Sequence, residues 1–420
     1  MRLSGTKTGS VNQYRGLGNQ LWDLAGNLPT LDLRFAESKS LNDSVSGSNL
    51  ITFTRPTGGS YVDSDGLIKV AGINTPRFDH NPATGECLGL LIEEMSINEL
   101  ARSEQFDNGT SWTINSATVT ANSVTSPNGT QTADLLTSTT SATFSRAWQS
   151  ILASGSVITA SCYLRADVPF TGSLRLQKDG VEVVVKDISI GTNWQRFEIT
   201  DTSAFTSNCE FHIFLNSNGT AGSSVSGRSL YLWGAQLEEK AFATSYIGPT
   251  LGSGGLARMA DTVSITGSNF LSWYRQDEGT VFVEVSPSGP AAAGNEAFVA
   301  IESAFNNSIR IIQQVATDRA VVQVQIPSGL QVNSPLGIGA LSRNETIKVG
   351  LAIKENDFYG IRTGGFAITD TTAAVPTGLT SLELGFTAIF PTTKKSFHVS
   401  RLTYWPERLP NATLQTITTP

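Results

Sequence analysis

Hydrophobic and polar residues alternate along most of this chain after about residue 30. Stretches such as EFHIFL (residues 210–215) and SLYLWG (residues 229–234) place apolar side chains at every second position. A period of two is typical of a β-strand that buries one face, because successive side chains point to opposite sides of the sheet. Turns rich in Gly, Asn, Ser and Thr separate these stretches. The pattern predicts an all-β protein of tandem antiparallel β-sandwiches (jelly rolls), because two one-sided sheets must cover each other.

Changes in this pattern divide the chain into regions. The first 30 residues are polar, rich in Gly and without periodicity, which predicts an extended N-terminal arm that becomes ordered only against a partner. A Gly/Ser-rich hinge is predicted at residues 248–255, where one series of strands ends and another begins. The apolar spacing within residues 90–106 predicts a short connecting helix. The predicted regions are the arm (1–30), a β-rich connector (31–99), a first sandwich (100–247), a second sandwich (255–410) and a C-terminal tail (411–420) with a short helix after Pro410.

Composition and charge exclude several classes of partner. The chain has 420 residues, with 29 Lys and Arg against 36 Asp and Glu, for a net charge of −7. This mild acidity argues against a phosphate-binding surface, so we expect no nucleic-acid partner. No stretch of about 20 apolar residues occurs, and the N-terminus lacks the apolar core of a signal peptide, so we expect cytosolic synthesis and no membrane insertion. Three cysteines without CxxC spacing predict buried free thiols rather than disulfides or a zinc site.

Residues with catalytic potential form no recognisable arrangement. His80, His212 and His398 stand in no HExxH or His-with-nucleophile setting, and two of them fall within predicted strands, where we expect structural roles. The neighbouring carboxylates Glu93 and Glu94 are adjacent rather than facing, which does not suit acid–base chemistry across a glycosidic bond. We therefore predict no catalytic residue, no metal site and no cofactor.

Aromatic residues are the candidates for sugar binding, because a sugar offers one apolar face and a ring of hydroxyl groups. Three of the seven tryptophans, at positions 194, 233 and 405, fall within predicted strands, and we expect them in the core. Four other aromatic residues lie near predicted strand ends or in polar surroundings. The candidate carbohydrate-binding residues are Trp112, Trp148, Trp273 and Tyr359.

Three parts of the chain resemble bacteriophage proteins. The stretch at residues 51–94, from ITFTRPTGG to LLIEE, resembles a block of virion proteins. NWQRFEIT (193–200) and LYLWGAQLEE (230–239) are similar to strands of a jelly roll of the carbohydrate-binding-module type. ARMADTVSIT, GTVFVEVSP and the terminal RLTYWPERLPNATLQTIT resemble the concanavalin or laminin-G-like sandwich of phage tail fibres and structural proteins. The resemblance covers roughly residues 31–420.

The resemblance implies a non-enzymatic virion component with lectin-like sandwiches, made in the host cytoplasm. One interpretation is a tail fibre or baseplate adhesin that contacts a host surface glycan. The alternative is a decoration or structural protein of the head or tail, whose sandwiches act as spacers and docking surfaces. In either case we expect attachment to other virion proteins through residues 1–30, and a symmetric homo-oligomer, most simply a trimer. A concave aromatic stripe on the first sandwich would favour the adhesin, and sheet faces covered by protein would favour the alternative.

Overall fold

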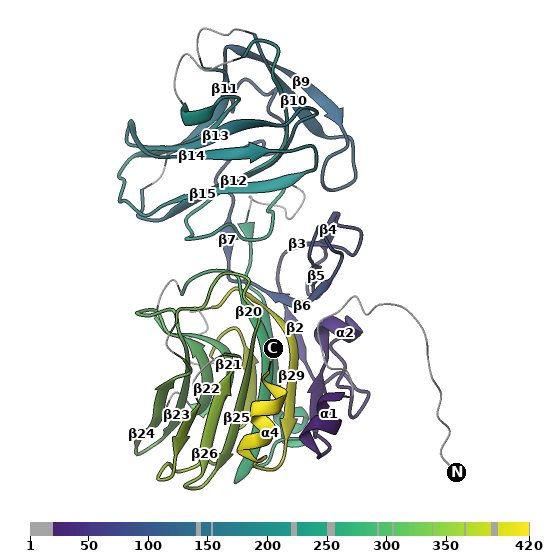
Figure 1. Ribbon diagram of the computed structural model, residues 1–420, viewed down its shortest axis with the longest axis vertical. Helices are drawn as coiled ribbons and strands as arrows, with labels where there is room; N and C mark the ends of the chain where they lie inside the picture. The colour runs from purple at the N-terminus through teal and green to yellow at the C-terminus, as the bar shows by residue number, and fades with distance from the viewer. Residues whose placement is uncertain are drawn as a thin grey trace, which may run out of the picture.

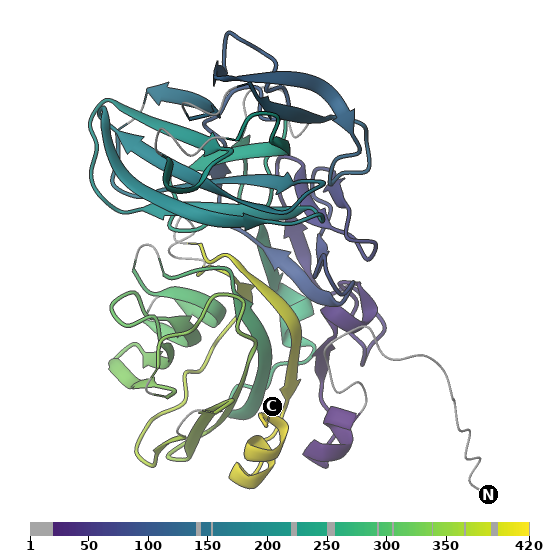
Figure 2. The same cartoon turned by 45° about the horizontal axis from the view of Figure 1, so that its top comes forward.

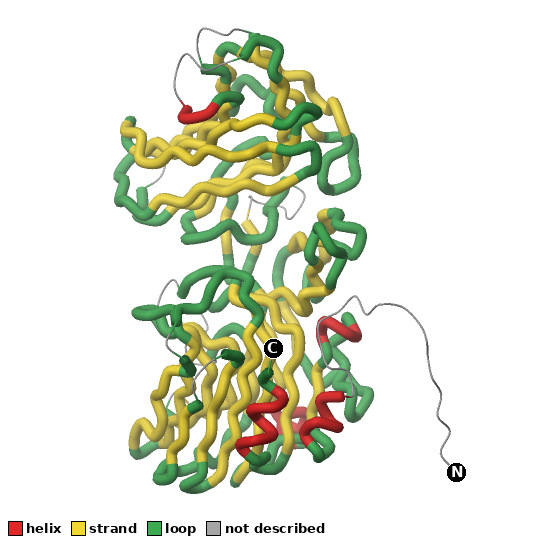
Figure 3. Tube along the Cα trace, viewed as in Figure 1, coloured by secondary structure: helices red, strands yellow, loops and turns green. Residues whose placement is uncertain are grey.

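Two β-sandwiches lie end to end along the long axis of the molecule (Figure 1). Strands make up most of both sandwiches, and helices occur only as short segments (Figure 3). The all-β class with antiparallel sandwiches is therefore confirmed. The computed structural model describes residues 20–139, 144–152, 154–219, 225–249, 257–291, 294–304, 306–337, 339–364, 367–387 and 394–419.

The lower sandwich in Figure 1 contains strands from both ends of the described chain, and we call it the terminal sandwich. Its first sheet has the order β27 (Ile368–Asp370), β26 (Phe358–Arg362), β25 (Ile347–Lys354), β20 (Glu278–Pro287), β29 (Phe397–Trp405), β6 (Cys87–Ile92) and β5 (Phe78–His80), and β1 (Leu31–Leu33) also pairs with β29. Its second sheet has the order β2 (Thr52–Thr54), β19 (Thr262–Thr266), β28 (Ser381–Leu384), β21 (Glu296–Ala304), β22 (Asn307–Gln313), β23 (Ala320–Ile326) and β24 (Gly329–Pro335).

The segment predicted as a connector, residues 31–99, belongs largely to this terminal sandwich. Leu31 lies opposite Tyr404 in the first sheet, and Leu90 lies opposite Val399. Both leucines are fully buried in the same hydrophobic core as Val399. The predicted boundary is corrected, because β1, β2 and β6 are only three to six residues long and each gains stability by pairing with a strand far away in the sequence.

The upper sandwich is inserted between two strands of a short stalk. β7 (Ser96–Ile97) pairs antiparallel with β18 (Ala257–Arg258), and the chain between them forms two five-stranded sheets. We call the first the inner sheet and the second the outer sheet. The inner sheet has the order β15 (Gln195–Asp201), β12 (Ile158–Arg165), β17 (Ser229–Glu238), β10 (Ala133–Ser138) and β9 (Ala117–Val124). The outer sheet has the order β14 (Val181–Ile190), β13 (Phe170–Lys178), β16 (Asn208–Phe214), β11 (Arg146–Leu152) and β8 (Thr113–Asn115), and a short 3-10 turn, η1 (Ser217–Gly219), follows β16.

This insertion changes the predicted order of two sandwiches in tandem. The inserted sandwich occupies the range predicted for the first sandwich, but strands that precede and follow it build the terminal sandwich together. The helix predicted within residues 90–106 is wrong, because β6 and β7 lie there and the remaining residues are irregular. Most of the predicted hinge, residues 250–255, lies outside the described residues. The three cysteines are free and buried, as predicted.

Short helices cover one outer face of the terminal sandwich. α1 (Gln20–Ala25) packs against α4 (Asn411–Ile417), and α4 lies on β25 and β26. Leu21 and Leu414 are fully buried there beside Trp405. The predicted helix after Pro410 is confirmed, whereas residues 20–25 of the predicted arm are folded against the sandwich; residues 1–19 lie outside the described part. The other helices are α2 (Phe35–Ser38) and α3 (Gly267–Leu271), and no helix of the described residues is long and apolar enough to cross a membrane.

A hairpin of β3 (Gly59–Val62) and β4 (Ile68–Ala71) lies between the two sandwiches. Figure 2 shows it in purple, beside the inserted sandwich. A turn forms at Asp63, whose carboxylate accepts hydrogen bonds from the backbone amides of Asp65 and Leu67, at 3.0 and 2.9 Å. Ile68 packs against Trp233 and Tyr246 and so covers part of the outward face of the inner sheet.

Candidate functional site

Three of the four predicted carbohydrate-binding residues are buried in the folded chain. Trp112 is 1% exposed and packs on Phe106 within the inserted sandwich, with ring centroids 4.5 Å apart. Trp273 and Tyr359 are each 3% exposed, the first inside the terminal sandwich and the second beneath α4. The prediction that these three rings are exposed platforms is therefore wrong, because neither face of a buried ring can reach a sugar.

Trp148 is the one predicted candidate whose ring is partly exposed. On β11, Arg146 and Trp148 point outward while Ala147 and Ile151 enter the core, as the strand alternation requires. The register places Trp148 opposite His212 of β16, and His212 opposite Arg175 of β13. The side chains of Asn115, Arg146, Trp148, Arg175, Glu210 and His212 define a surface that we call the Trp148 face.

Asn115 fixes the two central groups of this face. Its Oδ1 atom accepts hydrogen bonds from the indole Nε1 of Trp148 and from Nε of Arg146, each at 3.0 Å. The guanidinium of Arg146 lies over the rings of Phe144 and Phe214, 4.5 and 5.6 Å from their centroids. A ring and a cation held in this way lose little conformational entropy when a ligand binds.

His212 lies beneath the Trp148 ring and is almost fully buried. The two rings stack at 5.3 Å between centroids with an interplanar angle of 20°. Nδ1 of His212 accepts a hydrogen bond from Arg146 at 3.1 Å, since a guanidinium can only donate, so Nε2 carries the proton and donates to Glu210 at 3.0 Å. Burial, together with the charges of Arg175 and Arg146, lowers the pKa of His212 to about 2. His212 is thus a neutral, oriented support for its neighbours, in agreement with the structural role expected from its strand position.

A second partly exposed tryptophan, Trp194, borders an open cleft of about 480 Å³ beside the inner sheet. Trp194 donates its indole hydrogen to the carbonyl of Thr125 at 3.0 Å. The guanidinium of Arg165 lies 5.6 Å from the Trp194 ring and 4.4 Å from that of Tyr231, so it covers one side of both. Exposed Gln131 and other polar residues line the rest of the cleft. The expectation that Trp194 lies in the core is wrong, whereas Trp233 and Trp405 are buried as predicted.

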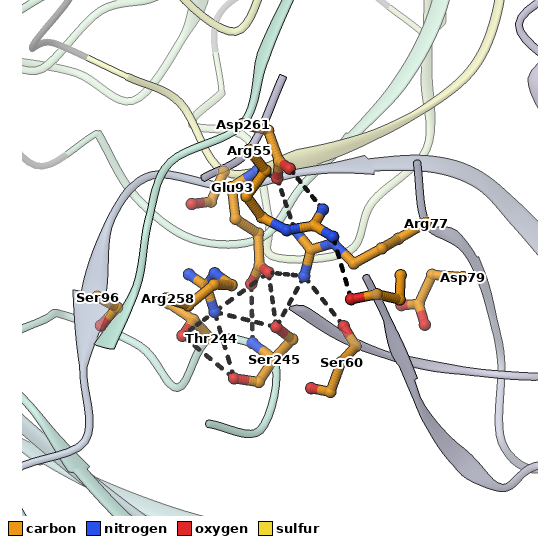
Figure 4. A network of polar contacts seen from close by, with 12 residues as sticks. Arg55, Ser60, Arg77, Asp79, Glu93, Ser96, Thr244, Ser245, Arg258 and Asp261 are labelled. Carbon is orange, nitrogen blue, oxygen red and sulfur yellow. Dashed lines mark hydrogen bonds and ion pairs between the residues drawn. The ribbon is translucent and has the colours of Figure 1, made fainter. Parts of the chain in front are cut away.

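The most extensive polar cluster lies at the junction of the two sandwiches (Figure 4). Arg77 donates to Glu93 at 2.6 Å and to Asp261 at 2.5 Å. Arg55 donates to the other oxygen of Asp261 at 3.0 Å, and Arg258 lies 3.2 Å from Glu93. All five side chains are at most 2% exposed. Three guanidinium groups therefore share two carboxylates in a region that the protein buries almost completely.

The inserted sandwich is bound to this cluster through a segment that follows β17. Ser245 donates to Glu93 from its backbone amide at 2.8 Å and from its hydroxyl at 2.7 Å. Burial alone would raise the pKa of Glu93, but Arg258, Arg77 and the hydrogen bonds from Ser245 lower it to about 2. Both carboxylates of the cluster are bound by arginines from distant segments of the chain, so we assign the cluster a structural role that fixes the junction. Within the described residues, no three His, Cys, Asp or Glu side chains are placed to hold a metal ion.

No family model and no curated protein matches the chain. Part of it is similar to solved structures. One is the CBM40 of the Ruminococcus gnavus IT-sialidase bound to α2,3 sialyllactose, at 11% identity and a TM-score of 0.30, over 35% of this chain and 84% of that chain. Another is domain 4 of the arabinanase AbnA from Geobacillus stearothermophilus in complex with arabinotriose, at 12% identity and a TM-score of 0.31, over 38% of this chain and 73% of that chain. A third is the enzymatically active domain of tailspike protein 4 from bacteriophage CBA120, at 19% identity and a TM-score of 0.26, over 34% of this chain and 21% of that chain. These values do not establish a common ligand.

Proposed function

We propose that this chain is a non-enzymatic, carbohydrate-binding component of a bacteriophage virion, a tail fibre or baseplate adhesin. The observation that carries the binding role is the Trp148 face. A partly exposed indole ring, fixed by Asn115, stands there beside planar hydrogen-bonding groups on one sheet surface. A sugar ring can stack its apolar face on the indole while its hydroxyl groups meet the neighbouring polar side chains.

The orientation of the inserted sandwich supports an adhesin. The outward face of the inner sheet packs against Ile68 and Tyr246 at the junction, so the outer sheet with Trp148 faces away from it. α1 and α4, near the two ends of the described chain, lie at the opposite end of the molecule (Figure 1). Attachment near the chain ends, through residues 1–19, would leave the Trp148 face pointing away from the particle. A trimer remains part of this proposal, tested by light scattering on the purified protein.

The second candidate function is a decoration or structural protein of the head or tail. The buried ionic cluster favours it, because this cluster fixes the two sandwiches as one rigid body, as a spacer requires. The two candidates differ in whether the Trp148 face has a ligand.

A glycan array probed with the full chain tests the adhesin. We expect binding to a defined set of oligosaccharides, and Trp148→Ala to weaken it about 30-fold or more, because a central aromatic contact contributes about 2 kcal/mol. Trp194→Ala is the matched control, since it removes the other partly exposed indole of the same sandwich. Thermal unfolding of both variants verifies that the fold is kept. Absence of binding to any glycan, or binding that survives Trp148→Ala, would contradict the proposal.

A further inference from the structure

The guanidinium of Arg146 has an unusual environment for a partly buried cation. Its hydrogen bonds go to Oδ1 of Asn115 and Nδ1 of His212, both uncharged acceptors. Within the described residues, no carboxylate lies at ion-pair distance from Arg146. More deeply buried arginines of this chain do meet carboxylates: Arg77 contacts Glu93 and Asp261.

The electrostatics of the Trp148 face leave this cation incompletely compensated. Burial, followed by repulsion from Arg175, lowers the pKa of Arg146 to about 10, and the negative charge of Glu210 offsets only part of this effect. Arg175 donates to Glu182 at 3.1 Å, but its Nε atom is buried without a partner. Both guanidinium groups lie over the Phe214 ring, 5.6 and 5.0 Å from its centroid, and an anion bound near them at the surface would stabilise both.

The indole ring and the guanidinium are close enough to contact one ligand together. The guanidinium carbon of Arg146 lies 5.5 Å from the centroid of the Trp148 ring. A single sugar ring stacked on the indole can extend an exocyclic carboxylate over this separation. A guanidinium recognises a carboxylate well, because its planar donors match the two oxygens.

We propose that the Trp148 face is selective for acidic sugars, with the sugar ring stacked on Trp148 and its carboxylate paired with Arg146. This inference rests on the proposed carbohydrate-binding function and names the class of sugar. His212 contributes by position only: its Nδ1 atom holds Arg146, and its neutral state adds no charge to the pair.

The test compares an oligogalacturonide with its carboxyl-reduced, neutral counterpart by titration calorimetry on the full chain. We expect the wild-type protein to prefer the acidic form about 10-fold or more, since a charge-assisted pair contributes roughly this factor. Arg146→Gln should remove the preference, so that the acidic and the neutral sugar bind with about equal affinity, and Arg146→Lys should restore part of it. Raising the salt concentration should also reduce the preference.

Arg165→Gln is the matched control, because Arg165 also lies over a tryptophan but in the separate Trp194 cleft. Equal affinity of the wild-type protein for the acidic and neutral sugars would overturn the inference and leave the proposed function intact. A preference that survives Arg146→Gln, or that is lost in Arg165→Gln, would also overturn it. If neither sugar form and no member of the glycan array binds, both the inference and the proposed function fall.

Discussion

Replacing Asp261 by Asn removes one negative charge from the buried junction and changes the side-chain volume very little. Asp261 is fully buried and accepts hydrogen bonds from Arg55 at 3.0 Å and Arg77 at 2.5 Å. Its Oδ2 atom also accepts a hydrogen bond from the backbone amide of Glu93 at 2.9 Å. In the variant, three guanidinium groups share a single carboxylate, that of Glu93. Breaking a buried ion pair by removing one partner costs about 3–5 kcal/mol, because the remaining charge stays desolvated.

Urea unfolding followed by circular dichroism and tryptophan fluorescence measures this cost. We expect Asp261→Asn to lower the free energy of unfolding by about 3–5 kcal/mol, and the transitions of the two sandwiches to separate, because the cluster joins them. Asp277→Asn is the control: Asp277 pairs with Arg275 where both side chains are largely exposed, and such pairs contribute about 0–1 kcal/mol. If Asp261→Asn costs no more than this control, the cluster does not hold the junction and the reasoning fails.

Two further predictions concern stability. The pKa of Glu93 is about 2 in the folded chain against an ordinary value of 4.5. The contribution of this carboxylate to the free energy of unfolding is therefore on the order of 3 kcal/mol. It is complete above about pH 5 and is lost as the pH falls towards 2. Urea midpoints between pH 3 and pH 7 should show this loss, and a Glu93→Gln variant that keeps the same acid dependence would exclude Glu93 as its source. Deleting residues 1–30 should lower the melting temperature further than deleting residues 1–19, because Leu21 and Trp22 pack against the terminal sandwich. Equal melting temperatures for the two truncations would show that this contact is not stabilising.

The sequence by itself determined the strands and their buried faces. In β16, Phe211 and Ile213 enter the core while Glu210 and His212 point outward, as their alternation predicts. This success has a local cause, because the two-residue period follows from the backbone geometry of an extended chain. The structural role expected for His212 follows from the same alternation, since the position lies within a strand.

Only the tertiary structure decided which strands pair and which tryptophans are exposed. β1 pairs with β29 from the opposite end of the chain, and no local pattern specifies a partner so far away. Both Trp112 and Trp148 were candidates for exposed rings, yet the first is covered by Phe106 and the second is partly exposed on the outer sheet. The junction cluster likewise joins Arg55 to Asp261, which lie 206 residues apart in the sequence. Exposure and ion pairing depend on which distant segments meet, and that is set by the packing of the whole molecule rather than by the residues nearby.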